Sequence, residues 1–390
     1  MNNKKNGIPK LRFPGFTGAW EQRKLGDLAE IVRGASPRPI SDPKWFDDNS
    51  DIGWLRISDV TNQNGRIYYL EQHISKLGQE KTRVITEPHL LLSIAATVGK
   101  PLINYIKTGV HDGFLIFLNP KFDLEYMYQW LEMFRPKWNK YGQPGSQVNL
   151  NSNLVRKQKI ALPSREEQQR ISSFLKQLDS LIALHQRKLE HLQEQKKGLL
   201  QKMFPKNGEV VPEVRFPGFT DAWEQRKLGE VIVSEHKGKV KSSMKGGNTN
   251  YLETNYLNGG IAQKVNATAD VSKNDVLILW DGSKAGTVYH GFEGALGSTL
   301  KVYVPKCSGD FLYQILKKDQ DKIYQRYRTP NIPHVIKNFT EKFIVSIPNV
   351  REQEKIAEFF HDLDSLIALH QRKLDHLELM KKGLLQQMFV

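Results

Sequence analysis

The sequence predicts an α+β protein with two mixed α/β domains, separated by a pair of long antiparallel coiled-coil helices and related by a pseudo-two-fold axis. Three observations predict this fold. The string LDSLIALHQRKL occurs at 178–189 and again at 363–374, within stretches whose apolar residues recur at heptad spacing. The string RFPGFTGAWEQRKLG at 12–26 recurs at 215–229 with one difference. Between string and helix, the two halves show no sustained identity. Each half of the chain therefore consists of the repeated 15-residue string, then a variable domain, and then a long helix.

The duplicated strings at 12–26 and 215–229, here called the boxes, differ only where Gly18 becomes Asp221. The second box lies 203 residues after the first, whereas the helical string recurs after 185. The segment between box and helix is thus shorter in the second half. This pattern predicts a repeated frame that holds two different domains.

The variable domains, here called the heads, read as mixed α and β. Short β-branched and aromatic runs predict strands, and longer periodic runs predict helices. In the first head we expect strands at 53–57, 66–70, 90–98 and 113–118 and a helix at 124–134. In the second we expect strands at 275–280, 286–289 and 299–304 and a helix at 311–327. Each head closes on a strand that ends in proline, at 159–162 and 343–347. The predicted domains are 1–162, first head; 163–204, first helix; 205–347, second head; and 348–390, second helix.

The sequence predicts where both long helices begin. Ser164 with Glu167, and Asn349 with Glu352, match the capping box, in which the first side chain takes one free amide and the glutamate reaches back to another. Each helix then runs about 38 residues, roughly 57 Å. Because the second box follows a helix, pseudo-symmetry places the N-terminal segment beside the end of the second helix. The predicted seam between the helices contains Leu175, Leu178, Ile182, His185, Leu189, Leu192, Phe360, Leu363, Ile367, His370, Leu374 and Leu377.

Two histidines and two lysines interrupt this seam at matching places. We interpret His185 and His370 as polar core positions that fix register, as a buried asparagine does in a coiled coil; metal binding and a pH switch are the alternatives. We interpret Lys196 and Lys381 as parts of solvated faces, or as cover for a partner helix.

Composition points to a polyanionic partner. The chain has 57 Lys and Arg against 42 Asp and Glu, a net charge of +15, which favours nucleic acid first and an anionic membrane second. The single cysteine, Cys307, excludes a disulfide framework and fits the cytoplasm. The longest apolar run, 90–98, is too short to cross a bilayer.

No catalytic or metal-binding motif is complete. The stretch 331–334, NIPH, lacks the first proline and the aromatic residue of an amino-methyltransferase loop. Gly99 and Lys100 lack the rest of a phosphate-binding loop, and the glycines at 291, 294 and 297 have the wrong spacing for a dinucleotide site. Asp42-Pro43-Lys44 has no convincing acidic partner for a nuclease site, and no paired-cysteine pattern exists. We therefore expect no active site, metal or cofactor in this chain.

The heads carry the candidate binding residues. Basic residues there alternate with Gly, Ser, Asn and Gln in loops, where Lys and Arg can contact phosphates and Arg, Asn and Gln can read base edges. The predicted DNA-binding residues are Arg33, Ser36, Arg38, Arg56, Lys140, Gln143, Ser146, Gln147, Asn149, Lys237, Lys239, Lys241, Lys245, Lys284, Arg326, Arg328 and Asn331.

The arrangement resembles the specificity subunit of type I restriction-modification systems over essentially the whole chain. The resemblance is carried by the two boxes, by the helix starts REEQQRI and REQEKIA, each after a proline, and by the two LDSLIALHQRKL strings. It implies that each head is a target-recognition domain that reads one half of a split double-stranded DNA sequence. It also implies that the helices set the gap between half-sites and dock two methyltransferase subunits.

The same resemblance places the cofactors on other chains. S-adenosylmethionine is expected on the methyltransferase subunits, and ATP and Mg on separate restriction subunits. Two other readings of the sequence remain: a self-contained DNA nuclease or methyltransferase with an unrecognised site, and a coiled-coil scaffold whose basic heads bind acidic proteins.

Overall fold

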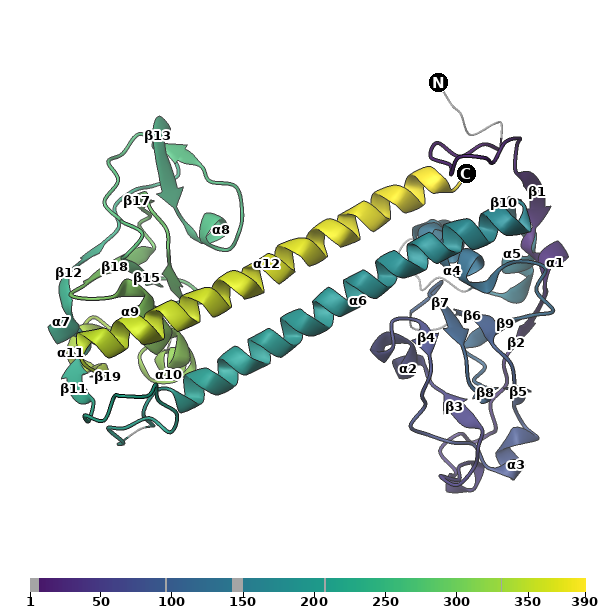
Figure 1. Cartoon of the computed structure of the whole chain (residues 1–390), viewed down its shortest axis with the longest axis horizontal. Coiled ribbons are helices and arrows are strands. Elements are labelled where there is room, and N and C mark those ends of the chain that lie inside the picture. Colours follow the sequence, from purple (N-terminus) through teal and green to yellow (C-terminus); the bar gives the residue numbers. More distant parts are fainter. Residues whose placement is uncertain (1–6, 95–96, 142–149, 207, 331) are drawn as a thin grey trace. The chain divides into compact units, whose positions relative to one another are not determined.

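The computed structural model describes residues 7–94, 97–141, 150–206, 208–330 and 332–390. The chain forms two compact units, Met1–Leu184 with Lys373–Val390, and His185–Arg372. Each unit contains one head and parts of both long helices (Figure 1). No helix among these residues is both long and apolar enough to cross a membrane.

The first unit contains the elements up to the middle of α6. In chain order these are β1 (Glu21–Lys24), α1 (Leu25–Leu28), β2 (Glu30–Arg33), η2 (Pro43–Trp45), β3 (Gly53–Leu55), α2 (Ile57–Asn62), β4 (Arg66–Ile67), α3 (Lys76–Gln79), β5 (Arg83–Ile85), β6 (His89–Ser93), β7 (Pro101–Asn104), β8 (Thr108–Val110), β9 (Phe114–Leu118), α4 (Leu124–Phe134), η3 (Arg135–Tyr141), α5 (Ser152–Lys157), β10 (Lys159–Leu162) and α6 (Arg165–Lys202).

The second unit contains the rest of α6 from His185, the elements that follow it, and α12 as far as Arg372. Its elements are β11 (Glu224–Lys227), α7 (Leu228–Val231), β12 (Ile232–Lys237), β13 (Lys245–Leu252), α8 (Thr254–Leu257), β14 (Lys264–Val265), β15 (Val276–Leu279), β16 (Val288–His290), β17 (Ala295–Leu296), β18 (Leu300–Pro305), α9 (Gly309–Lys318), α10 (Gln320–Arg326), α11 (Phe339–Lys342), β19 (Ile344–Ile347) and α12 (Val350–Met388).

Each head contains a sheet of the same topology, although the sequences of the two heads differ. The order β2-β9-β6-β7 in the first head matches β12-β18-β15-β16 in the second, and the first head adds β4 in parallel beside β7. In the four shared strands all neighbours are antiparallel. A second, three-stranded sheet accompanies each, ordered β3-β8-β5 or β14-β13-β17. The predicted mixed α and β class is confirmed, and the common topology shows that the heads are two versions of one domain.

Each box closes its head against the start of a long helix. The EQRK strands β1 and β11 pair antiparallel with the last strands, β10 and β19. Arg12 Nε donates to Glu167 Oε1 at 2.7 Å, and Arg215 Nε donates to Glu352 Oε1 at the same distance. A second nitrogen of each arginine contacts the other carboxylate oxygen. The duplicated arginine and the duplicated glutamate therefore form one duplicated bidentate pair.

This pairing corrects the predicted capping boxes. The first half of each cap is present, because the amides of Glu167 and Glu352 donate to Ser164 Oγ and Asn349 Oδ1. The glutamate side chains, however, bind the box arginines instead of reaching back to the cap amides. A guanidinium offers a carboxylate two charged donors in one plane, which a single amide cannot match.

The long helices run antiparallel, and the box segments pack against their ends. The Leu11 amide donates to the Gln387 carbonyl oxygen at 2.9 Å, in the first unit. In the second unit the Val214 amide contacts the Lys202 carbonyl oxygen in the equivalent way, also at 2.9 Å. The prediction that the N-terminal segment lies beside the end of the second helix is confirmed.

Several predicted strand ends were wrong for local reasons. The strand expected at 53–57 stops at Leu55, because Asp59 accepts from the Arg56 amide and starts α2. The strand expected at 66–70 ends at Ile67, because Gln63 Oε1 takes the amides of Tyr68 and Tyr69 out of the sheet. The helix expected at 311–327 is broken at Asp319 into α9 and α10.

Candidate nucleic-acid interface

Both predicted basic loops begin at the same place in the fold. The first strand after each box ends in a basic residue, Arg33 in β2 and Lys237 in β12, and a glycine follows. A Cβ on Gly34 would lie 2.2 Å from the His111 carbonyl oxygen, and one on Gly238 would lie 2.1 Å from that of Gly297. Only glycine permits so close a backbone approach. The two loops thus leave equivalent edges of the two sheets.

In the first head the structure brings three predicted residues together around Asp112. Arg33 Nε donates to the Asp112 carbonyl oxygen at 2.6 Å, Ser36 Oγ donates to Oδ1 at 2.9 Å, and an Arg38 nitrogen contacts Oδ2 at 2.7 Å. Burial acts to raise the pKa of Asp112, but Ser36, His111 and the two arginines hold it below the ordinary value. The Arg38 side chain is 73% exposed. Asp112 therefore orients a cation that remains accessible to a phosphate.

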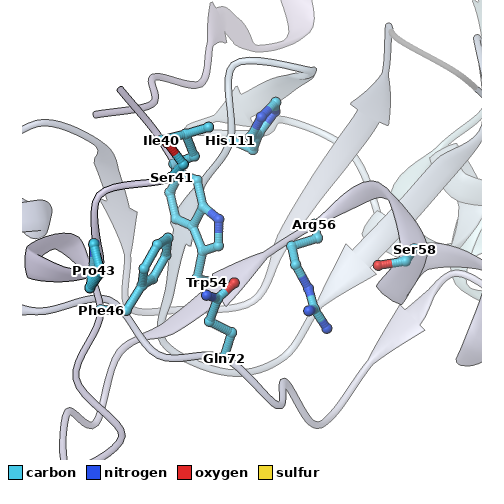
Figure 2. A pocket seen from close by; sticks show the side chains of 9 residues that line it. All are labelled: Ile40, Ser41, Pro43, Phe46, Trp54, Arg56, Ser58, Gln72 and His111. Carbon is cyan, nitrogen blue, oxygen red and sulfur yellow. The ribbon is translucent and has the colours of Figure 1, made fainter. Parts of the chain in front are cut away.

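Beside this loop lies an open pocket of about 620 Å³ (Figure 2). Its floor is aromatic, because buried Trp54 makes edge-to-face contacts with Phe46 and His111. Arg56 lines the pocket and is oriented by Asp59 at 3.0 Å and Glu71 at 3.4 Å. The other lining residues are Ile40, Ser41, Pro43, Ser58 and Gln72.

The sequence reading included Arg56 but missed His111 and Gln72. Both lie outside the basic runs that were used as the signal, and they reach the pocket only through the fold. Five further predictions for the first head are not tested: Lys140 lies in η3, but its side chain is outside the described part of the chain, as are Gln143, Ser146, Gln147 and Asn149.

His111 gives this head a pH dependence. Burial lowers its pKa, Arg33 and Arg38 act in the same direction, and Asp112 opposes them. The unfolded chain therefore takes up a proton more readily, and stability is lost as the pH falls from about 6.5 through the folded pKa. We expect His111→Asn to flatten the dependence of Tm on pH between about pH 7 and 5. The exposed His191→Asn serves as the control and should leave the slope unchanged. Equal slopes in His111→Asn and wild type would contradict the expectation.

In the second head the basic loop continues into β13, which pairs with β14 up to Asn250 and with β17 at Tyr251 and Leu252. Its first part, with β14, is here called the ribbon. Lys237 Nζ donates to Asp281 at 2.6 Å. Lys239, Lys241 and Lys245 are exposed and have no ion-pair partner among the residues described. The ribbon pairs β13 with β14 and has an irregular register between Lys245 and Thr249. Figure 1 shows β13 at the far end of the unit from β11 and β19. A ribbon of this kind can enter the major groove of DNA.

The remaining predicted residues of this head gather at the end of α10. Arg328 donates to the carbonyl oxygens of Tyr324 and Ser283 at 2.8 and 3.1 Å, and so ties the loop that carries Lys284 to the helix end. Lys284 and Arg326 are exposed. Asn331 lies outside the described residues. The donors of Arg328 are largely used inside the protein, whereas Lys284 and Arg326 remain accessible.

The predicted seam residues lie on a buried or half-buried face of each long helix. Leu175, Leu178, Leu189, Phe360 and Leu374 are buried, and the other seven predicted seam residues, Ile182, His185, Leu192, Leu363, Ile367, His370 and Leu377, are half-buried. The Nδ1 atoms of His185 and His370 lie 2.9 Å apart, so one ring donates to the other. Among the described residues no three His, Cys, Asp or Glu side chains are placed to hold a metal ion.

The interpretation of the seam lysines as solvated was wrong. The Lys196 side chain is only 13% exposed and its Nζ lies 2.6 Å from Asp364 Oδ1. Lys381 is 20% exposed and contacts Asp179 Oδ1 at 2.5 Å. Each lysine thus pairs with the aspartate of the LDSLIALHQRKL string on the antiparallel helix. That partner is remote in sequence, so a lysine on a seam looks the same as a solvated one until the helices are placed.

Each helix also leaves leucines uncovered. Leu181 and Leu184 on α6 are 46% and 39% exposed, and Leu366 and Leu369 at the matching positions of α12 are 40% and 39% exposed. Exposed apolar residues at repeated positions are typical of a surface that contacts another protein.

These features define a class: an internally duplicated protein with two heads of common topology, each with a basic loop and each packed on parts of two long helices. A family model, the type I restriction modification DNA specificity domain, matches residues 18–194 and again 220–379. The chain belongs to that family.

Individual proteins agree with this assignment. The chain is 33% identical over 178 residues to the type I restriction enzyme MjaVIII specificity subunit of Methanocaldococcus jannaschii, a match that covers 43% of this chain and 42% of that protein. It is 23% identical to the putative MjaX specificity subunit of the same organism, over 98% of this chain and 95% of the relative.

Solved structures show the same fold. The crystal structure of a type I restriction-modification S subunit from M. genitalium superposes with a TM-score of 0.70 at 15% identity, over 98% of this chain and 99% of the other. A second structure, from a study of complex assembly in a type I system, gives a TM-score of 0.50 at 16% identity, over 97% of this chain and 99% of the other.

Proposed function

We propose that this chain is the sequence-reading subunit of a type I restriction-modification complex, and that each head reads one half of a bipartite duplex target. One observation carries the proposal: a repeated frame of box, closing strand and helix start holds two heads that share a sheet topology but are unlike in sequence. The arginine–glutamate pair is present in both halves, whereas the loops of the two heads differ. Two domains that recognise different DNA half-sites need such a common framework and different loops. The chain itself is proposed to be non-catalytic.

The partners follow from the same proposal. Each long helix presents its own exposed leucine pair, which suits the docking of one methyltransferase subunit per helix. Those subunits would carry S-adenosylmethionine, and restriction subunits would carry ATP and Mg. The helices would set the gap between half-sites.

Exchange of one head tests the proposal. Replacing the first head by that of a relative, with the junction at Pro163 after β10, should change one half of the methylated motif and leave the other half and the gap unchanged. Replacing the second head instead, with the junction at Pro348 after β19, should change only the second half of the methylated motif. Mapping of methylated bases in the host genome is the measurement. A motif in which both halves change would contradict independent reading.

The alternative, a self-contained nuclease or methyltransferase, predicts a different result. The purified chain, free of partners, would then cut or methylate DNA when given Mg or S-adenosylmethionine. We expect no such activity from the chain alone, and sequence-specific retardation of duplex DNA by the assembled complex.

A further inference from the structure

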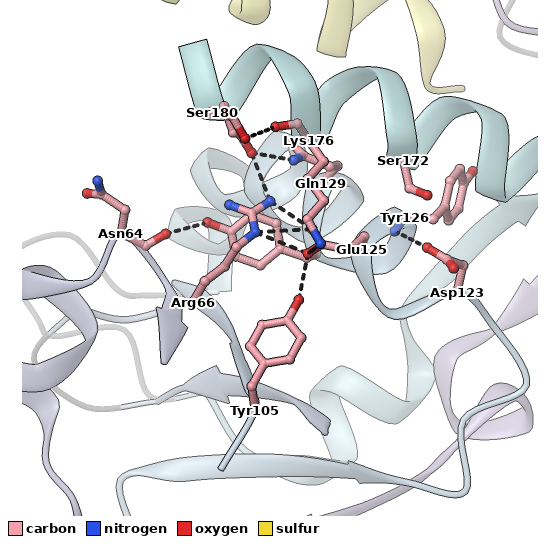
Figure 3. A network of polar contacts seen from close by, with 12 residues as sticks. Asn64, Arg66, Tyr105, Asp123, Glu125, Tyr126, Gln129, Ser172, Lys176 and Ser180 are labelled. Atoms are coloured by element: carbon pink, nitrogen blue, oxygen red, sulfur yellow. Dashed lines mark hydrogen bonds and ion pairs between the residues drawn. The ribbon is translucent and has the colours of Figure 1, made fainter. Parts of the chain in front are cut away.

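A polar cluster joins each head to both long helices. In the first unit, Gln129 of α4, which Figure 3 shows beside Arg66 and Glu125, donates from Nε2 to Asp179 Oδ2 at 2.7 Å. Lys381 of α12 contacts the other oxygen of the same carboxylate. Arg66 of β4 also contacts Asp179 Oδ2, at 2.9 Å. One carboxylate on α6 is therefore held by the head's helix, by the head's sheet and by the antiparallel helix.

The second unit contains the same cluster with the two long helices exchanged. Gln314 of α9 donates from Nε2 to Asp364 Oδ2 at 3.0 Å. Lys196 of α6 contacts both oxygens of Asp364, at 2.6 and 2.7 Å. Gln129 and Gln314 are 0% and 1% exposed.

The members of the two clusters are all 185 residues apart. This is the offset of the duplicated helical string, yet the glutamines lie inside the heads, where the halves otherwise diverge. The identity is local: a Tyr-Gln pair, 128–129 and 313–314, on the helix that follows the last strand of the shared sheet. The sequences around these positions differ, but α4 and α9 both have a glutamine that donates to the aspartate of the long helix.

A neighbouring contact follows the same offset. Glu125 of α4 pairs with Lys176 of α6 at 3.1 Å, and Asp310 of α9 contacts His361 of α12 at 3.4 Å. Asp310 has a second partner, His290 of β16, at 3.2 Å, as Glu125 has Arg66 of β4 at 2.7 Å. The acidic residue and its partners differ between the halves, but the positions of the acidic residue and of its partner on the long helix do not.

These contacts differ physically from the apolar core around them. Apolar packing is non-directional and tolerates small sliding or tilting of a head on the helices. Charge-assisted hydrogen bonds are short and directional, and removing one partner leaves the other charge without its counter-charge. The Asp179 side chain is 14% exposed and that of Asp364 is 38% exposed. A carboxylate on one long helix that is held both by the head's helix and by the opposite long helix therefore favours one orientation of the head relative to both helices.

We propose that Gln129, Asp179 and Lys381, with their counterparts Gln314, Asp364 and Lys196, are positioning residues that fix each head on the helix pair and so determine which gap between half-sites the protein accepts. The consequence for the gap rests on the proposed function. The fixing of the heads does not.

The second unit offers the cleaner test, because Asp364 has no arginine partner among the residues described. Lys196→Met removes the charge and keeps an unbranched side chain of similar reach. Lys197→Met, one residue away and exposed, is the matched control. Exchange of the pair, Lys196→Asp with Asp364→Lys, restores opposite charges. The Oε1 atom of Gln314 has no partner among the described residues and can accept from the new ammonium group once the amide turns.

The first measurement uses the full chain without DNA. Hydrogen exchange should show that Lys196→Met lowers the protection of α9 by about tenfold or more relative to Lys197→Met, and that the exchanged pair recovers it. Unchanged protection of α9 in a folded Lys196→Met protein would overturn the proposal, whatever the chain does with DNA.

The second measurement uses the complex with methyltransferase subunits and duplexes that keep both half-sites but vary the gap. Wild type and Lys197→Met should methylate one gap length. Lys196→Met should methylate at least one neighbouring length with its preference reduced by about tenfold, with the half-sites unchanged. A single accepted gap in Lys196→Met would overturn the role in spacing. If wild type shows no bipartite target, the proposed function fails, and the exchange result still decides the fixing of the head.

Discussion

Replacing Arg215 by methionine is expected to lower the free energy of unfolding by about 3–5 kcal/mol, the range for removing one partner of a buried ion pair. The Arg215 side chain is 11% exposed, and that of Glu352 is completely buried. Two nitrogens of the guanidinium reach the two carboxylate oxygens at 2.7 Å each. Without the arginine, the buried Glu352 carboxylate at the first turn of α12 would have no ion-pair partner among the described residues, and only the helix N-terminus would stabilise its charge. Urea unfolding of the full chain is the measurement.

The second box supplies its own control. Arg226 pairs with Glu224 on the same strand, but both side chains are about half exposed, at 48% and 66%. Arg226→Met should therefore change stability by no more than about 1 kcal/mol. Adding Glu352→Gln to Arg215→Met should recover part of the loss, because the amide carries no charge. Equal effects of Arg215→Met and Arg226→Met would show that burial of the pair is not what stabilises the frame.

Triple substitution of Lys239, Lys241 and Lys245 by glutamine is expected to weaken DNA binding by about 10- to 100-fold at physiological salt, and to reduce the slope of log K against log salt by about 3. These lysines have no ion-pair partner among the described residues. They follow the end of β12, as Arg38 follows the end of β2 in the first head. Each phosphate contact releases counterions, so the slope counts contacts and the affinity alone does not. Titration of the assembled complex with specific duplex at several salt concentrations measures both.

Loss of charge elsewhere on the same head is the matched control. Lys273, Lys306 and Lys337 are exposed and lie outside the ribbon. Their triple substitution by glutamine changes the net charge equally, and we expect a slope change of less than about 1. If both triple variants change the slope alike, the ribbon has no special part in binding and the effect is one of overall charge.

The repeats made the architecture predictable from the sequence. Heptad spacing predicted the long helices, and the two-fold relation between the repeated halves predicted that they run antiparallel. The expected helix at 124–134 coincides with α4. Strand ends were less predictable, because single side chains such as Gln63 and Asp59 redirect the backbone there. The shared topology of the heads could not be read at all, since strand order depends on contacts between residues far apart in the sequence.

The candidate site divides in the same way. Basic loops after the first strand of each head were visible as composition, and so was Arg56. His111 and Gln72, which line the pocket, gave no signal, because neither is part of a basic run and both are brought there by the fold. The buried glutamines had a weak signal, the Tyr-Gln pair at the 185-residue offset, which gains meaning only beside Asp179 and Asp364.

By itself, then, the sequence determined that the chain has a duplicated frame, two unlike basic heads and two long helices that meet along an apolar seam. These are consequences of local periodicity and of repetition, which need no knowledge of distant contacts. The tertiary structure alone decided where the charges go: Arg12 and Arg215 to the glutamates at the helix starts, and Lys196 and Lys381 to aspartates on the opposite helix. The ion-pair partner of a charged side chain cannot be identified from the sequence alone. Whether it is solvated or buried depends on what the fold brings within about 4 Å of it.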